Sequence, residues 1–494
     1  MDLALNLSGS GPRGRMLVGA LREAILSGRL VSGTRLPSSR LLAAQLRIAR
    51  GTVVAAYEEL VSEGYCEARV GAGTFVAITP PPRQMARPVR PVRLSAWAQR
   101  LPVQEPVDDQ EPLIRFDFRS GLSEEGFPDT ALARALRRAA EQITSGVGAG
   151  DPAGSLRLRR ALVHHLGRTR GLRADPEQVI VVSGSQQGID LASRLLMDPG
   201  DRACIEEPGY PRARAVFTAL GARLSAVPVD RDGLIVDALP SEDIRMLYVT
   251  PSHQYPTGAV LTPERRLALL DWAERNDVWL LEDDYDSEFR YAGPPLPCLQ
   301  GLDRAGRCLY VGSVSKLLHP ALRTGCIIVP PALVPAAVEA KRTLDQATTP
   351  LMQEALADMF ESGEIERHLR RALRFYRRRR AHLLAALAGG LGPGVRIWPV
   401  TGGLHLYVEA PDLPGRVVFA EARRRGVAVT DASDCLLSDS SGTRLILWFS
   451  RIPLDRLAAG IEALRDALDA ARGSAEPAGF PDRQPLPKRR TVHA

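Results

Sequence analysis

One lysine in this chain occupies a position that its chemistry explains better than its charge does. The stretch VGSVSKLLHPALRTG (311–325) carries Lys316; of the 64 lysines and arginines, just Lys316, Lys341 and Lys488 are lysines. Both residue types supply a cation, but the lysine amine can lose its proton and attack a carbonyl to form a Schiff base. We therefore interpret Lys316 as a candidate nucleophile. The alternative is an ordinary surface lysine.

Residues on both sides of this lysine, and one earlier turn, are suited to a phosphate. SGSQQG (183–188) joins an expected strand to an expected helix, and its small residues let backbone N–H groups and Ser185 face an anion. Ser313 and Arg323 would bring further donors to the same phosphate. Turns of this kind are also common without a ligand, so this segment alone is weak evidence.

An acidic segment and a tyrosine extend the set. EDDYDSEF (282–289) places Asp283 and Tyr285 at the end of an expected strand, where they would bind a pyridinium proton and a phenolate oxygen. Tyr210, in EPGYPRAR, would stack on a flat ring. The alternatives are a solvated acidic turn and plain core packing. Taken together, the amine, the phosphate donors, the carboxylate and the aromatic ring meet the requirements of pyridoxal 5'-phosphate.

The elements that must position these residues alternate between buried strands and amphipathic helices. We expect strands in 178–184, 202–209, 245–253, 278–285, 307–316 and 325–331. QQGIDLASRLLM (186–197) and PERRLALLDWAERN (263–276) have the apolar spacing of helices. Alternation of this kind predicts an α/β fold with a mostly parallel sheet covered by helices. Ligands of such sheets bind beyond the carboxyl ends of the strands, where the candidate residues lie.

The ordered set of motifs resembles the fold-type I aminotransferases over residues 114–472. The segments that carry the resemblance are SGSQQGID, EEPGYPRAR, VTPSHQYPTG, LLEDDYDSEFRY and VGSVSKLLHPALRTG. The resemblance implies that Lys316 forms the internal aldimine, that Asp283 pairs with the pyridine nitrogen and that Tyr285 bonds the ring hydroxyl. It implies that Tyr210 stacks on the ring. The residues it implies for the phosphate are Ser185, Gln186, Ser313 and Arg323.

Two features depart from the aminotransferase pattern. The family carries an asparagine immediately before Pro-Thr-Gly, and Tyr255 occupies that position here, after His253 and Gln254. The family also keeps a late arginine for the substrate carboxylate. Arg444 is the nearest candidate, at a longer spacing than usual, and Arg212 is a second one. Both departures affect the geometry of a substrate and its turnover.

The N-terminal region is rich in arginine. Residues 11–50 contain eight arginines and one acid, Glu23, an imbalance that points to a polyanion rather than to a merely solvated face. We expect helices in 14–30, 36–46 (capped by Ser38) and 47–65, and a glycine-tipped hairpin in 66–77. This order predicts a winged helix-turn-helix; the alternative is a helical packing module with no ligand.

In a winged helix-turn-helix the N-terminal residues of the recognition helix enter the major groove. Arg50 and Thr52 lie there, so we expect them to contact DNA bases or phosphates. Arg40 would face the DNA backbone, and the wing tip of Gly71, Gly73 and Thr74 would lie near the minor groove.

The region from LPSSRLLAAQL to VSEGY resembles the GntR family of bacterial regulators. A GntR-type reader, a linker and an aminotransferase-like domain in one chain resemble the MocR subfamily of that family. This resemblance implies a transcriptional regulator that senses pyridoxal 5'-phosphate, or an amine or amino-acid effector, through the aldimine at Lys316. It implies double-stranded operator DNA and a head-to-tail homodimer as partners. The alternatives are an active aminotransferase with a fused DNA-binding module, and a repressor with a relic domain.

Composition and length agree with several domains. We expect the DNA-binding domain in 11–77, a proline-rich linker in 78–113, the cofactor domain in 114–472 and a disordered tail in 473–494. The six cysteines form no C-x-x-C pair, which argues against a zinc site or a disulfide framework. No apolar run is long enough for a membrane helix, and we expect a cytoplasmic protein that binds no metal.

Overall fold

The chain divides into two compact units, residues 1–93 and 94–494. The computed structural model describes residues 12–77, 92–102, 113–121, 127–144, 150–240, 243–291, 293, 296–314, 316, 318–399, 401–438 and 441–474. Most of the expected linker and nearly all of the expected disordered tail lie outside the described residues.

The first unit is a small helical domain with a two-stranded wing. Its elements are α1 (Arg13–Leu26), α2 (Ser39–Leu46), α3 (Arg50–Ser62), β1 (Cys66–Arg69) and β2 (Gly73–Val76). The Ser38 hydroxyl accepts a hydrogen bond from the backbone N–H of Leu41 and so caps α2. Leu17, Val53 and Leu60 are buried where α1 and α3 pack together. The predicted winged helix-turn-helix is confirmed.

The second unit is built on an eight-stranded sheet. Across the sheet the strands are β4 (Val179–Val182), β11 (Gly325–Ile328), β10 (Cys308–Ser313), β9 (Trp279–Asp284), β8 (Met246–Val249), β5 (Arg202–Glu207), β6 (Arg223–Asp230) and β7 (Gly233–Leu234). Strands β10, β9, β8, β5 and β6 run parallel, and β11 runs antiparallel between β10 and β4. The expected mostly parallel sheet is present.

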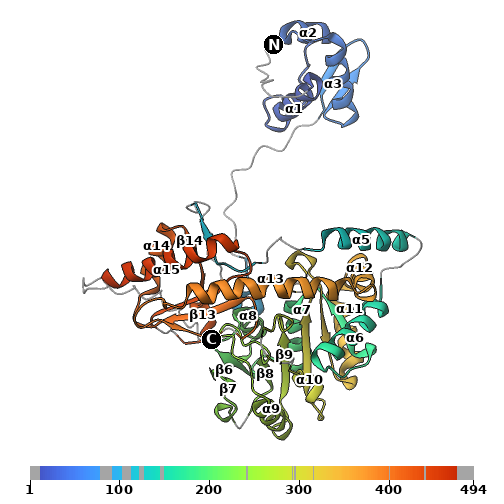
Figure 1. Ribbon diagram of the computed structural model, residues 1–494. Helices are drawn as coiled ribbons and strands as arrows, with labels where there is room; N and C mark the ends of the chain where they lie inside the picture. The colour runs from blue at the N-terminus through green and yellow to red at the C-terminus, as the bar shows by residue number, and fades with distance from the viewer. Residues whose placement is uncertain are drawn as a thin grey trace, which may run out of the picture. The chain divides into compact units, whose positions relative to one another are not determined.

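Helices cover both faces of this sheet, as Figure 1 shows. The helices are α6 (Leu156–Arg170), α7 (Ser185–Leu196), α8 (Pro211–Leu220), α9 (Pro263–Arg275), α10 (Leu299–Leu302), α11 (Val334–Asp345) and α12 (Pro350–Glu361), and α5 (Asp129–Thr144) packs on α12. Along β4, Ile180 and Val182 pack in the core with α7, whereas Val179 and Val181 pack in the core with α6 and α12. This burial on both faces explains why the strands read as continuous apolar runs.

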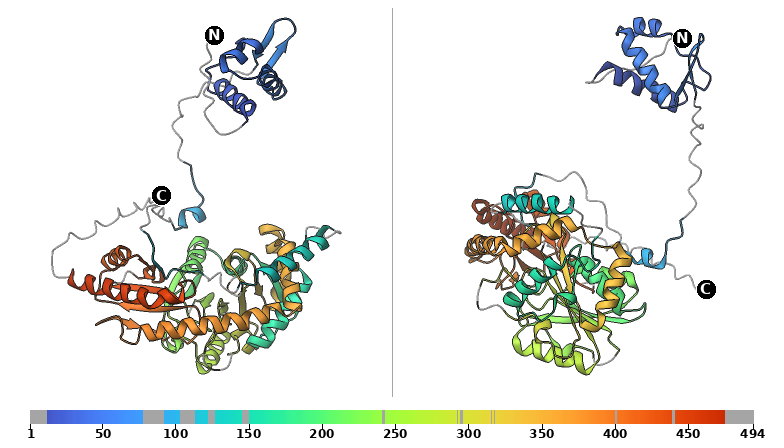
Figure 2. Two further views of the ribbon diagram at one scale, coloured as in Figure 1. Left: turned by 45° about the horizontal axis from the view of Figure 1, so that its top comes forward. Right: turned by 90° about the vertical axis from the view of Figure 1, so that its right-hand side faces the viewer.

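A smaller layer follows the long helix α13 (Glu364–Ala386). Its sheet has the order β12 (Arg396–Ile397), β13 (His405–Ala410), β16 (Thr443–Trp448) and β15 (Thr430–Asp431). Helices α14 (Gly415–Arg424) and α15 (Leu454–Gly473) pack against each other beside it (Figure 2, red). The short strand β3 (Phe116–Asp117) pairs in parallel with β14 (Val427–Ala428), which joins the start of this unit to its end.

Part of the expected linker is folded. Ser95 caps the short helix α4 (Ala96–Arg100), and the Arg100 guanidinium donates a 3.0 Å hydrogen bond to the carbonyl of Ala219 at the end of α8. The composition of 78–113 predicts a semi-extended segment, and residues 95–100 differ from this prediction. A helix of this length does not persist alone, and here the contact between Arg100 and Ala219 stabilises it.

Candidate functional site

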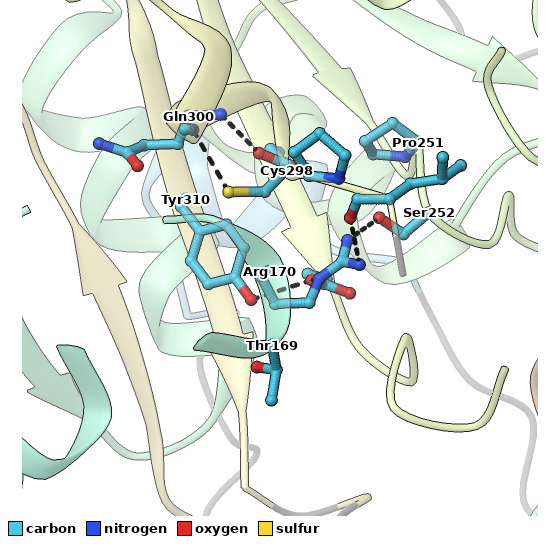
Figure 3. A network of polar contacts seen from close by, with 12 residues as sticks. Thr169, Arg170, Pro251, Ser252, Cys298, Gln300 and Tyr310 are labelled. Carbon is cyan, nitrogen blue, oxygen red and sulfur yellow. Dashed lines mark hydrogen bonds and ion pairs between the residues drawn. The ribbon is translucent and has the colours of Figure 1, made fainter. Parts of the chain in front are cut away.

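The acidic segment that ends β9 divides its carboxylates between the two faces of the sheet. Side chains alternate along a strand, so Asp283 and Asp284 point in opposite directions. Oδ2 of Asp284 accepts hydrogen bonds from Nε of Arg170 at 2.7 Å and from the Tyr310 hydroxyl at 2.9 Å. Arg170 also donates to the Ser252 hydroxyl, and Figure 3 shows these side chains gathered in one network. Asp284 therefore has a structural role at the strand end.

Asp283 faces the opposite side and keeps one oxygen free. Its Oδ2 accepts a 2.7 Å hydrogen bond from the hydroxyl of Tyr248 on β8. Its Oδ1 is buried and has no hydrogen-bond partner among the described residues. Burial raises the pKa of Asp283 to about 7; the Tyr248 hydrogen bond opposes this shift, and the nearby charge of Asp284 adds to it. A buried carboxylate with a free oxygen fits a protonated ring nitrogen, which would satisfy both its charge and its lone pair.

Lys316 lies just past β10 among aromatic side chains. Its Nζ is 4.5 Å from the centre of the Trp448 ring. Burial lowers the pKa of the Lys316 amine, while the negative charge of Asp286 acts in the opposite direction. A lowered pKa increases the share of neutral amine, which is the nucleophilic form.

Tyr255 is the centre of an aromatic cluster beside this lysine. Its ring centre is 5.3 Å from that of Tyr210, 6.0 Å from that of Tyr285 and 5.6 Å from that of His405. The ring of His405 lies in turn 4.7 Å from that of Trp448. These contacts bring Tyr210, Tyr285 and Lys316 into one site, although they come from three separate segments of the chain.

The first turn of α7 faces an arginine. Gly184, the residue before α7, has φ +95°, and a Cβ there would lie 3.6 Å from Cζ and Nη1 of Arg323. Arg323 has the left-handed φ of 47° and forms no ion pair with another described residue. A guanidinium at a helix N-terminus suits a phosphate, because both groups attract anions.

The other expected phosphate residues surround the same turn. Ser185 and Gln186 begin α7, and Ser313 ends β10, where it is paired with Gly325 of β11. Gly325 lies close to this turn, since a Cβ added to it would be 3.2 Å from Cα of Gly184. Gln186 donates a 3.1 Å hydrogen bond from its side-chain amide to the carbonyl of Arg212. Its Oε1 is buried without a hydrogen-bond partner among the described residues.

The turn after β8 separates the roles of its polar residues. The side chain of Gln254 accepts from the Thr257 hydroxyl at 2.5 Å and donates to the carbonyl of Pro208 at 2.8 Å, so it organises the turn itself. His253 instead reaches the site, where its Nδ1 is 2.9 Å from the hydroxyl of Tyr285. We singled out neither His253 nor Trp448 as a site residue; both are rare residue types that follow or end a strand, which is the signal that would have identified them.

The two candidates for a carboxylate have different surroundings. On β16, Arg444 shares a strand face with Trp448 but stands four residues away, about 13 Å along the strand. Its Nε is 4.0 Å from Oε1 of Glu409, and it donates to the Ser441 carbonyl. Arg212 is exposed at the start of α8, beside Tyr210. Burial raises the pKa of Tyr210 to about 12, and the positive charge of Arg212 opposes this shift. Arg212 is thus the candidate nearer the aromatic cluster, and both stay predictions.

In the first unit the expected DNA-contacting residues lie at helix starts. Arg50 is the first residue of α3, is exposed and donates a 3.3 Å hydrogen bond to the Ser39 hydroxyl. Arg40 is exposed on α2. Thr52 is half-buried, and a Cβ added to Gly14 on α1 would lie 3.3 Å from its Cγ2, so Thr52 also packs against α1.

The wing has the turn that its glycines predict. Gly71 and Gly73 take φ of +76° and +114°, and the exposed Val70 precedes them at the tip. Thr74 lies on β2. The side chain of Arg35 reaches this wing, where a Cβ added to Gly73 would lie 3.2 Å from its Nε. Arg35 was not among the predicted residues, because nothing in the sequence distinguishes it from the neighbouring arginines.

Two broader expectations bear on the whole chain. The six cysteines are buried, and none of them forms a disulfide in the structure. Within the described ranges, the structure has no helix that is both long and apolar enough to span a membrane.

Two family models match the chain. The model "Aminotransferase class I and II" matches residues 120–447, and the model "Bacterial regulatory proteins, gntR family" matches residues 14–76. The two matches correspond to the larger and the smaller unit of the structure.

Relatives that share the whole arrangement are named as regulators. The probable rhizopine catabolism regulatory protein MocR of Rhizobium meliloti is 36% identical, over 96% of this chain and 97% of the relative. The pyridoxine biosynthesis transcriptional regulator PdxR of Corynebacterium glutamicum is also 36% identical, over 91% of this chain and 94% of its own.

Among solved structures the larger unit is similar to aminotransferases. The kynurenine aminotransferase of Pyrococcus horikoshii, in complex with PMP, has a TM-score of 0.69 at 27% identity, over 73% of this chain and 92% of its own. The α-aminoadipate aminotransferase LysN of Thermus thermophilus, complexed with N-(5'-phosphopyridoxyl)-L-leucine, has a TM-score of 0.67 at 27% identity, and the match covers 73% of this chain and 93% of LysN.

Proposed function

Because the chain belongs to the MocR-type transcriptional regulators, which join a gntR-family DNA-binding domain to an aminotransferase class I and II domain, we propose that it controls transcription through pyridoxal 5'-phosphate bound at Lys316. The observation that carries the proposal is Asp283, a buried carboxylate with one oxygen left free. The relative PdxR, named as a regulator of pyridoxine biosynthesis, adds support.

Each part of the cofactor has a matching group in the site. Pyridoxal 5'-phosphate supplies an aldehyde that condenses with amines and a ring that withdraws electrons from them. The amine of the half-buried Lys316 would hold the aldehyde, and Asp283 would bind the ring nitrogen. Tyr285 would donate to the ring oxygen and Tyr210 would cover a ring face. The proposed phosphate ligands are Ser185, Gln186, Ser313 and Arg323.

We propose an amine or amino acid as the effector, since an amine competes with Lys316 for the cofactor aldehyde. The aromatic faces of Tyr255 and Trp448 would enclose it, and Arg212 or Arg444 would bind a carboxylate. Such an effector changes DNA binding only if its affinity differs between two conformations of the protein. A change at the site must therefore reach the DNA-binding domain through the linker or through a partner subunit.

A head-to-tail homodimer is the assembly that we propose, with the DNA-binding domain of each chain over the large domain of its partner. Helix α4 is held on α8 by the hydrogen bond of Arg100, so residues 78–94 lie between the DNA-binding domain and the anchored part of the larger unit. A chain of that length spans at most about 60 Å, at about 3.5 Å per residue, which sets an upper limit on the reach of the DNA-binding domain.

An absorbance titration of the purified protein tests the proposal. The protein should show the visible band of bound pyridoxal 5'-phosphate, and borohydride should fix the cofactor on Lys316. Amines and amino acids should be added one by one, with DNA binding followed in parallel. A colourless protein that takes up no cofactor and yields no borohydride adduct on Lys316 contradicts the proposal.

An active aminotransferase is the second candidate. It is favoured by the likeness to solved aminotransferases at 27% identity and by a site that contains an amine nucleophile and an acidic partner. A panel of amino acids with 2-oxo acids separates the two functions. Sustained turnover of about 1 per second or more is an ordinary enzyme rate and would replace the purely regulatory function.

A further inference from the structure

A buried histidine stands behind the tyrosine of the candidate site. Nδ1 of His253 is 2.9 Å from the hydroxyl oxygen of Tyr285 and 3.0 Å from Oδ1 of Asp286. His253 and Asp286 are 3% and 1% exposed. Neither oxygen of Asp286 has a hydrogen-bond partner within the described part of the chain, so its charge acts on His253 mainly through proximity.

The position of the His253 ring is fixed by backbone on two sides. A Cβ on Gly403 would lie 1.9 Å from Cε1 of the ring, and one on Gly258 would lie 3.1 Å from its Nε2. The ring of His405 is 5.1 Å away, and its own Nε2 is 3.1 Å from the carbonyl oxygen of Pro256. The two glycines therefore leave room for the His253 ring only in this place, beside the hydroxyl of Tyr285.

The hydrogen bond between Tyr285 and Nδ1 of His253 can run in either direction, because each group can donate or accept. Either Tyr285 donates to Nδ1, or Nδ1 carries the hydrogen and donates to the Tyr285 oxygen. The carboxylate of Asp286, 3.0 Å from Nδ1, favours the tautomer with the hydrogen on that nitrogen, because its negative charge attracts the positive end of the N–H dipole. When His253 donates, the hydrogen of Tyr285 must point elsewhere.

We propose that the Asp286–His253 pair turns the hydroxyl hydrogen of Tyr285 toward the ring oxygen of bound pyridoxal 5'-phosphate. His253 is then a positioning residue, which acts on the cofactor through Tyr285. This inference rests on the proposed function and deepens it: it gives His253 a role in directing the donor that meets the ring oxygen of the cofactor. The pair thereby sets the protonation state of the cofactor at a given pH.

Charged groups of both signs lie around His253. The acidic groups nearby are Asp286 and Asp283 at the end of β9. The basic groups are Lys316, whose amine feels the Asp286 charge, and Arg170 and Arg290, which line a small void together with His253 and Asp286. Burial holds the pKa of His405 well below its usual value, so this neighbour stays neutral.

The same cluster has the composition of a small metal site, since the ligand atoms of His253, Asp286 and His405 lie within 4.8 Å of one another. Nδ1 of His253 is engaged with Tyr285, so a metal ion here would bind its Nε2, which is buried and has no hydrogen-bond partner among the described residues. Metal binding is therefore an outcome that the test must include.

Two substitutions of His253 separate position from mere volume. In the full chain loaded with cofactor, His253→Asn keeps a donor where Nδ1 stands, whereas His253→Gln moves the donor toward the place of Nε2. A donor at the ring oxygen stabilises its anion and lowers the pH midpoint of the visible band. We expect His253→Gln to raise this midpoint by about one pH unit or more, and His253→Asn to change it by less than about 0.3.

A third variant checks that the effect passes through Tyr285. In a Tyr285→Phe background, the substitution His253→Gln should shift the midpoint no further. Equal shifts in the Asn and Gln variants, no shift in the Gln variant, a full shift in the Phe background, or one bound metal ion per chain in the native protein would each overturn the inference. A protein with no visible band at all would instead defeat the proposed function.

Discussion

The hydroxyl of Tyr248 donates a 2.7 Å hydrogen bond to Oδ2 of Asp283 from the neighbouring strand β8. Both side chains are buried, and the second oxygen of the carboxylate has no partner among the described residues. Burial raises the pKa of Asp283 to about 7. An ionised Asp283 therefore costs free energy until a cation, such as a pyridinium ring, binds beside it.

This cost predicts the behaviour of Asp283→Asn. An aspartate has a pKa of about 4 in the unfolded chain, so the unfolded form loses its proton first as the pH rises. The cofactor-free wild type should lose stability between pH 4 and about 7 through this group. The asparagine variant lacks this loss, and urea unfolding at pH 8 should show it to be about 1–3 kcal/mol more stable.

The same substitution should weaken cofactor binding at least tenfold, because a neutral amide cannot balance a pyridinium charge. The stability difference should shrink toward pH 5, which serves as the internal control. A variant that is less stable than wild type at pH 8, or that binds the cofactor equally well, would remove Asp283 from its proposed role.

Lys316→Arg tests whether chemistry rather than charge is needed at that position. Arginine keeps the cation near Trp448 but its guanidinium does not form the link to an aldehyde. The visible band and the borohydride adduct should disappear, while circular dichroism stays unchanged. Lys341→Arg is the matched control, since Lys341 is buried in α11 and paired with Asp345. It should keep the band; a band that survives in the Lys316 variant shows that another amine holds the cofactor.

The fold was predictable where the sequence pattern is local. Two-sided burial makes β4, β8 and β10 continuous apolar runs, so their type and order followed from composition and periodicity. Strand β6 was not expected, because its residues Arg223–Asp230 lie toward one edge and are mostly half-buried or exposed. Helix α4 was not expected either, because it is held by the hydrogen bond from Arg100 to Ala219, a residue far along the chain.

The site was predictable as a list of residues but not as a set of contacts. Asp283 and Asp284 are adjacent and chemically identical, and only the strand fixes which one meets Arg170 and which one keeps a free oxygen. The partner of Asp283 stands 35 residues earlier at Tyr248. Trp448 reaches Lys316 from a different sheet. Contacts over such separations depend on the packing of layers, which local patterns do not encode.

Gly184→Ala tests the phosphate end of the site. Alanine is strained at φ +95°, and its Cβ would approach the Arg323 guanidinium to 3.6 Å, in the space proposed for the phosphate. Gly200→Ala is the matched control, because φ is +100° there and no described atom lies within 4 Å of the added Cβ. We expect both variants to lose about 1–2 kcal/mol of stability.

Only the Gly184 variant should also bind the cofactor more weakly, by about tenfold or more. A tenfold loss of affinity corresponds to about 1.4 kcal/mol. Cofactor titration followed by the visible band measures this difference. Equal affinities in the two alanine variants would place the phosphate away from the start of α7.

Arg50→Ala tests the placement of α3 on DNA. Arg50 is exposed at the first residue of this helix, where its guanidinium can reach a base edge. Operator binding should weaken by about 1–3 kcal/mol, with relaxed specificity at one base position. Arg22→Ala on α1 is the control, because Arg22 is engaged at 2.6 Å with Glu63 and an exposed pair of this kind is worth little. Gel shifts at a fixed salt concentration compare the variants. If the Arg50 variant binds its operator like wild type while the Arg22 variant does not, α3 is not the recognition helix.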